Sequence, residues 1–228
     1  MDKNQFNLCK EVLIRLENKG VLKHVILIGS WCLPFYKEYL KSNKYNPSIR
    51  TRDMDFLISS PNKIKTKVDI PEMLKDLGFL VDIGGSKGVV RLQHPDLMIE
   101  FLVPEKGKGT DKPYPLPMLG VNAQTIRFLN LLTENTITIK INTVNLILPH
   151  PINWALQKLI IYQRRGSKDK AQKDFEAAIG LLKALITKGE SENIINIFKS
   201  QPLRWQNKIR KGLEKSEESK VLKIFMEA

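Results

Sequence analysis

The chain has 228 residues, of which 42% are hydrophobic and 27% are charged. This composition is typical of a folded protein and excludes a disordered one, and the length allows one large domain or two small ones. No apolar run approaches the roughly 20 residues that cross a bilayer, and the first ten residues lack the apolar stretch of a secretory signal. Two cysteines cannot build a disulfide framework, so we expect a cytoplasmic protein without a membrane partner.

The charge is strongly positive, with 37 Lys and Arg against 24 Asp and Glu and a formal net charge of +13. An excess of this size favours polyanionic partners such as nucleic acid, nucleotide phosphates or an anionic membrane surface. The sequence contains no basic tail, so we expect the excess to lie on folded surfaces. The alternative is a surface that is merely rich in lysine.

Hydrophobic periodicity predicts alternating helices and short strands in the first two thirds of the chain. The expected elements are helix 5–18, strand 24–29, a helix opened by Ser30, strand 52–59, helix 71–78, a hairpin of 79–83 and 89–93 turning at 84–88, strand 97–103, and a hairpin of 136–141 and 144–149. The segment 104–117, rich in Pro, Gly and Lys, predicts a long loop, and such loops are often functional.

From residue 150 onward the pattern is helical, with helices expected at 154–165, 169–189 and 192–200 and a charged helix at the end. We therefore predict an α+β fold in which a mixed sheet with flanking helices is followed by a helical lobe. The expected domains are a core at 1–148 and a helical C-terminal domain at 149–228.

One constellation combines a glycine turn with three carboxylates. Gly29 and Ser30 follow a short apolar strand and open a helix, whose N-terminal N–H groups bind phosphate oxygens well. Asp53 and Asp55 lie two residues apart in the next strand, so their side chains point to the same face. Mg²⁺ prefers such oxygen ligands alongside substrate phosphates, and Glu100 in a later strand is the candidate for a third ligand.

Each part of this pattern is weak alone, because acid-x-acid triples also occur at 174–176 and 190–192. The acids at 53, 55 and 100 differ in that they interrupt apolar strands, where a buried charge needs a partner or a metal. A strand glutamate such as Glu100 can instead be an edge or solvent-face residue. Asp96 is the alternative third acid, although it lies in a turn.

These residues resemble the nucleotidyltransferase superfamily with the DNA polymerase β-like fold, over residues 25 to about 182. The segments IRTRDMDFLI and LPHPINWALQKLIIYQRRGSKDKAQKDFEAA are similar to signatures of bacterial nucleotidyltransferase-like proteins, including the abortive-infection toxin group. The resemblance implies phosphate binding by Gly29 and Ser30 and Mg²⁺ or Mn²⁺ binding by Asp53, Asp55 and Glu100. The family's third acid is usually Asp, so Glu100 departs from the pattern.

The resemblance also implies nucleotide-binding residues outside the core motif, and it places Lys158 among the catalytic residues. These residues are Lys158, Arg165, Lys173 and Asp174; Arg52, which flanks the acidic pair, is a further candidate for nucleotide binding. The plainer interpretation is structural: Lys170 and Asp174, like Asp169 and Lys173, are spaced four apart and could form ion pairs along an exposed helix. Arg52 could likewise face away from the metal and be structural.

The sequence thus predicts a metal-dependent nucleotidyltransferase that moves a nucleoside monophosphate from an NTP to an acceptor hydroxyl. The positive charge favours tRNA or another RNA as the acceptor, and the toxin-group resemblance adds an antitoxin protein as a partner. Two alternatives stay open. One is a non-catalytic nucleic-acid-binding module on a degenerate transferase fold, and the other is a transferase acting on an aminoglycoside-like small molecule.

Overall fold

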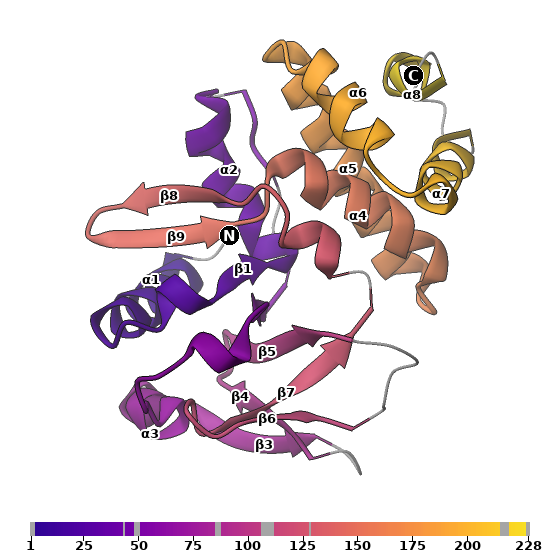
Figure 1. Ribbon diagram of the computed structural model, residues 1–228. Coiled ribbons are helices and arrows are strands. Elements are labelled where there is room, and N and C mark those ends of the chain that lie inside the picture. The colour runs from indigo at the N-terminus through magenta and orange to yellow at the C-terminus, as the bar shows by residue number, and fades with distance from the viewer. Residues whose placement is uncertain are drawn as a thin grey trace. The chain divides into compact units, whose positions relative to one another are not determined.

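The computed structural model describes residues 3–42, 44–47, 51–84, 88–105, 112–127, 129–214 and 219–226 (Figure 1). The chain forms two compact units, of which the first comprises Met1–Phe35 and Ser48–Pro149 and the second comprises Tyr36–Pro47 and His150–Ala228. The division therefore falls within a helix near residue 36 as well as at residue 150. Among the described residues, no helix is both long and apolar enough to cross a membrane.

The first unit is built on a mixed β-sheet with strand order β1-β2-β5-β4-β3, in which β7 also pairs with β5 and β6 pairs with β7. The strands are β1 (Ile26–Ile28), β2 (Asp53–Leu57), β3 (Leu80–Gly84), β4 (Val89–Gln93), β5 (Met98–Pro104), β6 (Tyr114–Leu116) and β7 (Val121–Ile126). The helices α1 (Lys3–Asn18) and α3 (Ile70–Leu74) and the hairpin of β8 (Ile137–Ile141) and β9 (Val144–Leu148) belong to the same unit. The predicted α+β class is confirmed.

The centre of the sheet is the parallel pair β2 and β5. Met54 and Phe56 on β2 are fully buried, and the Phe56 ring stacks on Phe101 of β5 with centroids 5.6 Å apart. Because side chains alternate between the two faces of a strand, burial of Met54 and Phe56 turns Asp53 and Asp55 to the opposite face.

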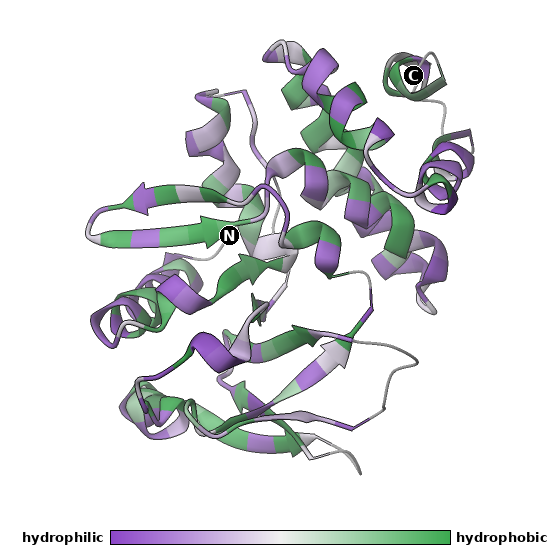
Figure 2. Cartoon of the chain, viewed as in Figure 1, coloured by the Kyte–Doolittle hydropathy of each residue, from purple (hydrophilic) through white to green (hydrophobic). Residues whose placement is uncertain are grey.

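Strand β3 lies at one end of this strand order and is unusually apolar for an edge (Figure 2). Leu80, Val81 and Ile83 are 73%, 52% and 65% exposed. Its described partner is β4, with which it forms the predicted hairpin. Residues 85–87 of the predicted turn lie outside the described residues.

The structure corrects the prediction of an unbroken loop at 104–117. Strand β5 extends to Pro104 and β6 occupies Tyr114–Leu116, while residues 106–111 lie outside the described part. The sequence patterns did not single out β7 either. Strand β6 has only three residues, and the six residues of β7 include three polar ones; β6 pairs with β7, which pairs with β5 as well.

The second unit consists of the distal part of α2 (Cys32–Leu40) and of the helices that follow residue 150. These helices are α4 (Pro151–Ile161), α5 (Lys168–Thr187), α6 (Ser191–Lys199), α7 (Leu203–Glu214) and α8 (Ser219–Met226). Helix α4 is its core element, since every residue from Pro151 to Ile160 is buried. The single charged terminal helix that the sequence predicts is two helices, α7 and α8.

A hydrogen-bonded chain of three side chains joins α2 to the helices of this unit. The His150 Nδ1 caps α4 by accepting from the Ile152 N–H at 3.3 Å, so in the neutral ring the proton resides on Nε2. That Nε2 lies 3.2 Å from the Tyr39 hydroxyl, which donates to Glu190 at 2.8 Å. Lys188 pairs with Glu190 at 2.9 Å, and its ammonium lies 3.7 Å from the centroid of the Tyr39 ring.

This chain predicts a loss of stability in acid. Burial lowers the pKa of His150 below its ordinary 6.5, an effect that Glu190 opposes and Lys188 reinforces, so the folded protein holds the ring neutral. A group with a depressed histidine pKa stabilises the folded state above the unfolded pKa and loses that contribution as pH falls below it. Urea unfolding at about pH 7.5 and about pH 5.5 tests this.

The matched variant is His150→Asn, which keeps a side-chain acceptor for the Ile152 N–H but does not titrate. We expect the free energy of unfolding of the unmodified protein to fall more between the two pH values than that of the variant. Glu190 does not contribute in this window, because its pKa is lowered to about 2 from an ordinary 4.5. Equal losses in the two proteins would contradict the assignment.

Candidate active site

The predicted carboxylates lie on neighbouring strands of the first unit. Asp53 and Asp55 are half-buried on one face of β2, and in the parallel pairing Asp55 is directly in register with Glu100 of β5. Laterally paired residues share a face, so the structure brings the Glu100 side chain to the same face as the two aspartates. The strand positions that the sequence predicted for all three acids are therefore confirmed.

Gly29 lies against one of these carboxylates. A Cβ at Gly29 would stand 2.6 Å from Asp55 Oδ2, and the residue has a φ of +71°. Both facts require glycine here, because other residues disfavour this backbone region and the carboxylate leaves no room for a side chain. The predicted glycine turn and Asp55 are thus in contact.

Ser30 is placed differently from the prediction. Residues Gly29–Trp31 form a short 3₁₀ turn that runs into α2 at Cys32, so Ser30 lies inside the turn and does not cap the helix with its side chain. Its backbone stays at the start of the helical segment, where a phosphate oxygen finds N–H donors. The predicted phosphate binding by Gly29 and Ser30 stays a prediction.

Glu100 has a partner that the sequence did not reveal. Arg91 of β4 stands opposite Glu100 in the antiparallel pairing, and its Nε forms an ion pair with Glu100 Oε1. The Glu100 side chain is 13% exposed and that of Arg91 is 36% exposed, so this pair is largely shielded. The signal available in the sequence was one arginine in an apolar strand, and its partner depends on the register of a hairpin.

The ion pair between Arg91 and Glu100 affects the prediction that Glu100 binds a metal ion, because the same carboxylate would have to serve both. Across the part of the chain that the structure describes, no group of three or more His, Cys, Asp and Glu side chains is arranged to hold a metal ion. Two carboxylates on one face, Asp53 and Asp55, still match the way Mg²⁺ is bound when substrate phosphates and water supply its other ligands. The residues therefore fit a two-carboxylate metal site, and Glu100 as a third ligand stays a prediction.

The segments just before β2 and β5 are held together by the Gln5 side chain, which no sequence pattern marks as functional. The Gln5 amide of α1 donates to the carbonyl oxygens of Thr51, at 3.0 Å, and Asp96, at 2.9 Å. The Thr51 hydroxyl accepts from the Asp53 N–H at 3.0 Å. Gln5 thus links the residues that precede the two acid-bearing strands, β2 and β5, and we regard it as a positioning residue.

Arg52 is exposed and donates from Nη1 to the carbonyl oxygen of Pro95 at 2.9 Å. This contact links the same two segments and matches the structural interpretation of Arg52. Its predicted role in nucleotide binding is untested. Asp96, the alternative third acid, lies in the turn before β5, where its backbone N–H donates to His94 Nδ1 at 3.1 Å.

The predicted helical residues form an ion-pair cluster in the second unit. Asp174 is buried and accepts from Lys158 Nζ at 2.6 Å and from Arg165 Nε at 2.7 Å. The alternative of i,i+4 pairs on an exposed helix is therefore wrong for Asp174. Lys173 is exposed and does not take part in this cluster.

Burial explains the arrangement of this cluster. The Lys158 side chain is 7% exposed and would carry an uncompensated charge inside α4 without Asp174. The Arg165 side chain is 39% exposed and reaches solvent. The cluster bears one net positive charge, and its predicted contact with a triphosphate stays a prediction.

Comparison with known proteins gives one family. A family model described as "Nucleotidyltransferase" matches residues 7–197. No curated protein that was compared matches the chain. Among solved structures, the antibiotic-resistance factor ANT(2'')-Ia in solution is similar at 12% identity, with 88% of this chain and 94% of that chain covered and a TM-score of 0.46. An antigenic nucleotidyltransferase-like protein from Paracoccidioides brasiliensis is 17% identical, with coverages of 85% and 93% and a TM-score of 0.40.

The contact between Gly29 and Asp55 predicts a specific sensitivity to substitution. Gly29→Ala is expected to lower the free energy of unfolding by about 1–2 kcal/mol from the left-handed backbone alone. It should also displace the Asp55 carboxylate, because the new Cβ overlaps Oδ2. Gly20→Ala is the matched control, since Gly20 has a φ of +66° but its nearest neighbour to a Cβ is the end of the Lys23 side chain at 3.8 Å. A loss for Gly29→Ala no larger than for Gly20→Ala, measured by urea unfolding, would refute the crowding.

The buried ion pair predicts a second stability effect. Asp174→Ala leaves the Lys158 ammonium buried without an anion and is expected to cost about 3 kcal/mol or more in urea unfolding. The double variant Lys158→Met/Asp174→Leu leaves no unpaired buried charge and should lose less than the single variant. A double variant that is as unstable as Asp174→Ala would show that lost packing, and not the unpaired charge, is responsible.

Proposed function

We propose that this chain, which belongs to the nucleotidyltransferase family that it matches, transfers a nucleoside monophosphate from an NTP to an acceptor hydroxyl with the help of Mg²⁺ or Mn²⁺. The observation that carries the proposal is the packing of Asp55 against the Gly29 turn. It brings a candidate metal ligand and a candidate phosphate cradle into direct contact. A nucleotidyltransferase requires both, because the metal must meet the phosphates that it neutralises.

Asp53 and Asp55 would hold the metal, which when bound supplies charge neutralisation at the transferring phosphate. The backbone N–H groups of the Gly29–Trp31 turn would bind the β- and γ-phosphate oxygens and so orient the α-phosphate for in-line attack. Glu100 would complete the site, as a further ligand or as the acceptor of the proton from the attacking hydroxyl, and either role requires its carboxylate to leave the ion pair with Arg91 or to share it. Pyrophosphate leaves as the phosphoester bond to the acceptor forms.

RNA is the acceptor class that the charge supports best. A net charge of +13 attracts a polyanion and repels a cationic small molecule such as an aminoglycoside. We propose tRNA or another RNA as the acceptor. The resemblance to the abortive-infection toxin group is the basis for proposing an antitoxin protein as a further partner.

A second candidate is a non-catalytic nucleic-acid-binding module that retains the fold. The observation that favours it is the ion pair of Glu100 with Arg91, which occupies the third carboxylate. Such a protein would bind RNA with a strong salt dependence but would not turn over NTP.

The two candidates are separated by incubating the purified protein with Mg²⁺, each of the four α-³²P-labelled NTPs in turn, and total tRNA. We expect label to move onto RNA, and we expect Asp55→Asn to reduce the transfer by about 100-fold or more, because it removes an anion from the proposed metal site. Chelation of the divalent ion should abolish the transfer.

Asp69→Asn is the matched control. Asp69 is an exposed carboxylate of the same unit that caps α3 by accepting from the Glu72 N–H at 3.0 Å, and asparagine can retain this bond. Transfer that falls equally in both variants would contradict the assigned metal site. Label on the protein itself would replace RNA by a protein acceptor, and unlabelled RNA that still binds both variants would favour the binding module.

A further inference from the structure

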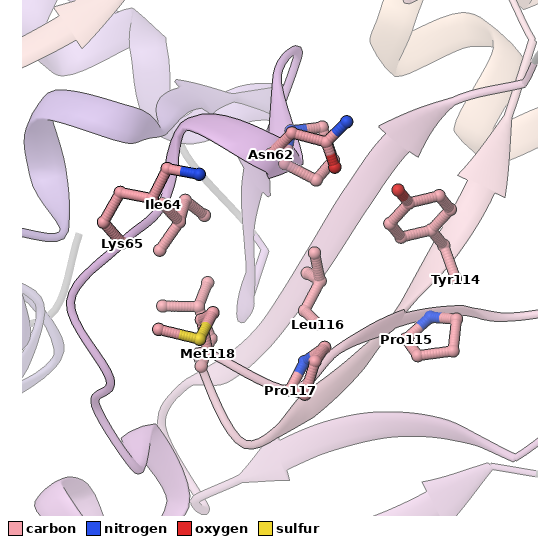
Figure 3. A pocket seen from close by; sticks show the side chains of 10 residues that line it. Asn62, Ile64, Lys65, Tyr114, Pro115, Leu116, Pro117 and Met118 are labelled. Carbon is pink, nitrogen blue, oxygen red and sulfur yellow. The ribbon is translucent and has the colours of Figure 1, made fainter.

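The first unit contains a groove that the proposed reaction does not use (Figure 3). It has a volume of about 400 Å³ and lies between the segment that follows β2 and the segment formed by β6 with its following turn. The residues that shape it include Asn62, Ile64, Lys65, Tyr114, Leu116 and Met118. Most ligand pockets measure 300–1,000 Å³, so the groove is large enough for one nucleotide-sized group.

The floor of the groove is apolar and its rim is polar. Ile64 and Leu116 are 5% and 3% exposed and form the floor. The Tyr114 side chain stands at one end and that of Lys65 at the other, with Leu116 between them (Figure 3). Tyr114 is 38% exposed and therefore presents ring surface to a ligand. The exposed Asn62 adds an amide that both donates and accepts hydrogen bonds.

The sequence around the groove is rich in lysine. Lys65 lines the groove, the exposed Lys63 and Lys67 lie two residues before and after it, and the exposed Lys112 lies two residues before Tyr114. Within the described residues, none of these four lysines forms an ion pair with a carboxylate, and no lining residue is acidic. Their charge is therefore available to an anionic ligand, which a polyanion with regularly spaced charges would match best.

We propose that this groove binds single-stranded nucleic acid, with one base stacked on Tyr114 and the neighbouring phosphates on the lysines. A base provides the flat apolar face that the floor and ring require, and its polar edge suits the Asn62 amide. Stacking on one aromatic ring is sequence-tolerant, because every base has such a face. The site rests on these residues alone and is independent of any NTP turnover.

The test is the binding of a fluorescein-labelled single-stranded RNA of about ten nucleotides, a length that covers one such site, to the full chain. Binding is followed by anisotropy over a range of salt concentrations. Tyr114→Ala is expected to weaken binding about tenfold, because stacking contributes appreciably for each base, whereas Tyr114→Phe retains the ring and should bind normally. The Lys63→Ala/Lys65→Ala double variant should make the salt dependence shallower by about 0.7 in the logarithmic slope for each phosphate that the protein no longer neutralises.

Two controls make the outcome decisive. Lys140→Ala removes an exposed lysine from β8, outside the groove, and should leave the binding of RNA nearly unchanged. An abasic strand of the same length keeps the phosphates but removes the bases, so it should bind the unmodified protein about as weakly as intact RNA binds Tyr114→Ala. Equal affinity for the abasic and intact strands, or unchanged affinity in Tyr114→Ala, would overturn the proposal and leave only unspecific attraction between charges.

Discussion

The two-residue alternation of β2 is the constraint on which the rest of the first unit depends. Met54 and Phe56 must face the core, and the stacking of Phe56 on Phe101 ties that requirement to the neighbouring strand β5. Because Met54 and Phe56 occupy the core face of β2, the carboxylates of Asp53 and Asp55 must lie on the opposite face. The position of the acids is thus a consequence of apolar packing, and a shift by one residue would bury both charges and expose both core side chains.

Because apolar packing determines where these elements lie, the apolar pattern of the sequence predicts many of them. The predicted strands and helices are confirmed where the apolar pattern extends over many residues, as in α1, β5 and α5. The turn at Gly29 could also be predicted, because this glycine follows a buried strand and precedes a helix. Strands β6 and β7 left a weaker mark, because β6 has only three residues and the alternation in β7 rests on two small apolar side chains, Val121 and Ala123.

Partners across the fold could not be predicted from one sequence. That Glu100 meets Arg91 depends on the register of the β4–β5 pairing, and one residue of slippage would separate them. The same holds for Gln5, whose amide reaches two loops far along the chain. For Asp174 the spacing suggested neighbours on its own helix, but its carboxylate is buried and pairs with the buried Lys158 and with Arg165, whose side chain also reaches solvent.

The apolar edge strand β3 has a consequence for how this protein behaves in solution. An edge with exposed Leu80, Val81 and Ile83 offers unpaired backbone groups as well as apolar side chains, which is the usual template for strand addition between molecules. What opposes such contact is mutual repulsion between chains of charge +13, and added salt screens that repulsion within about 10 Å at 0.1 M. The same charge repulsion therefore keeps the molecules apart in solution and prevents pairing between their β3 edges. Raising the ionic strength weakens both effects.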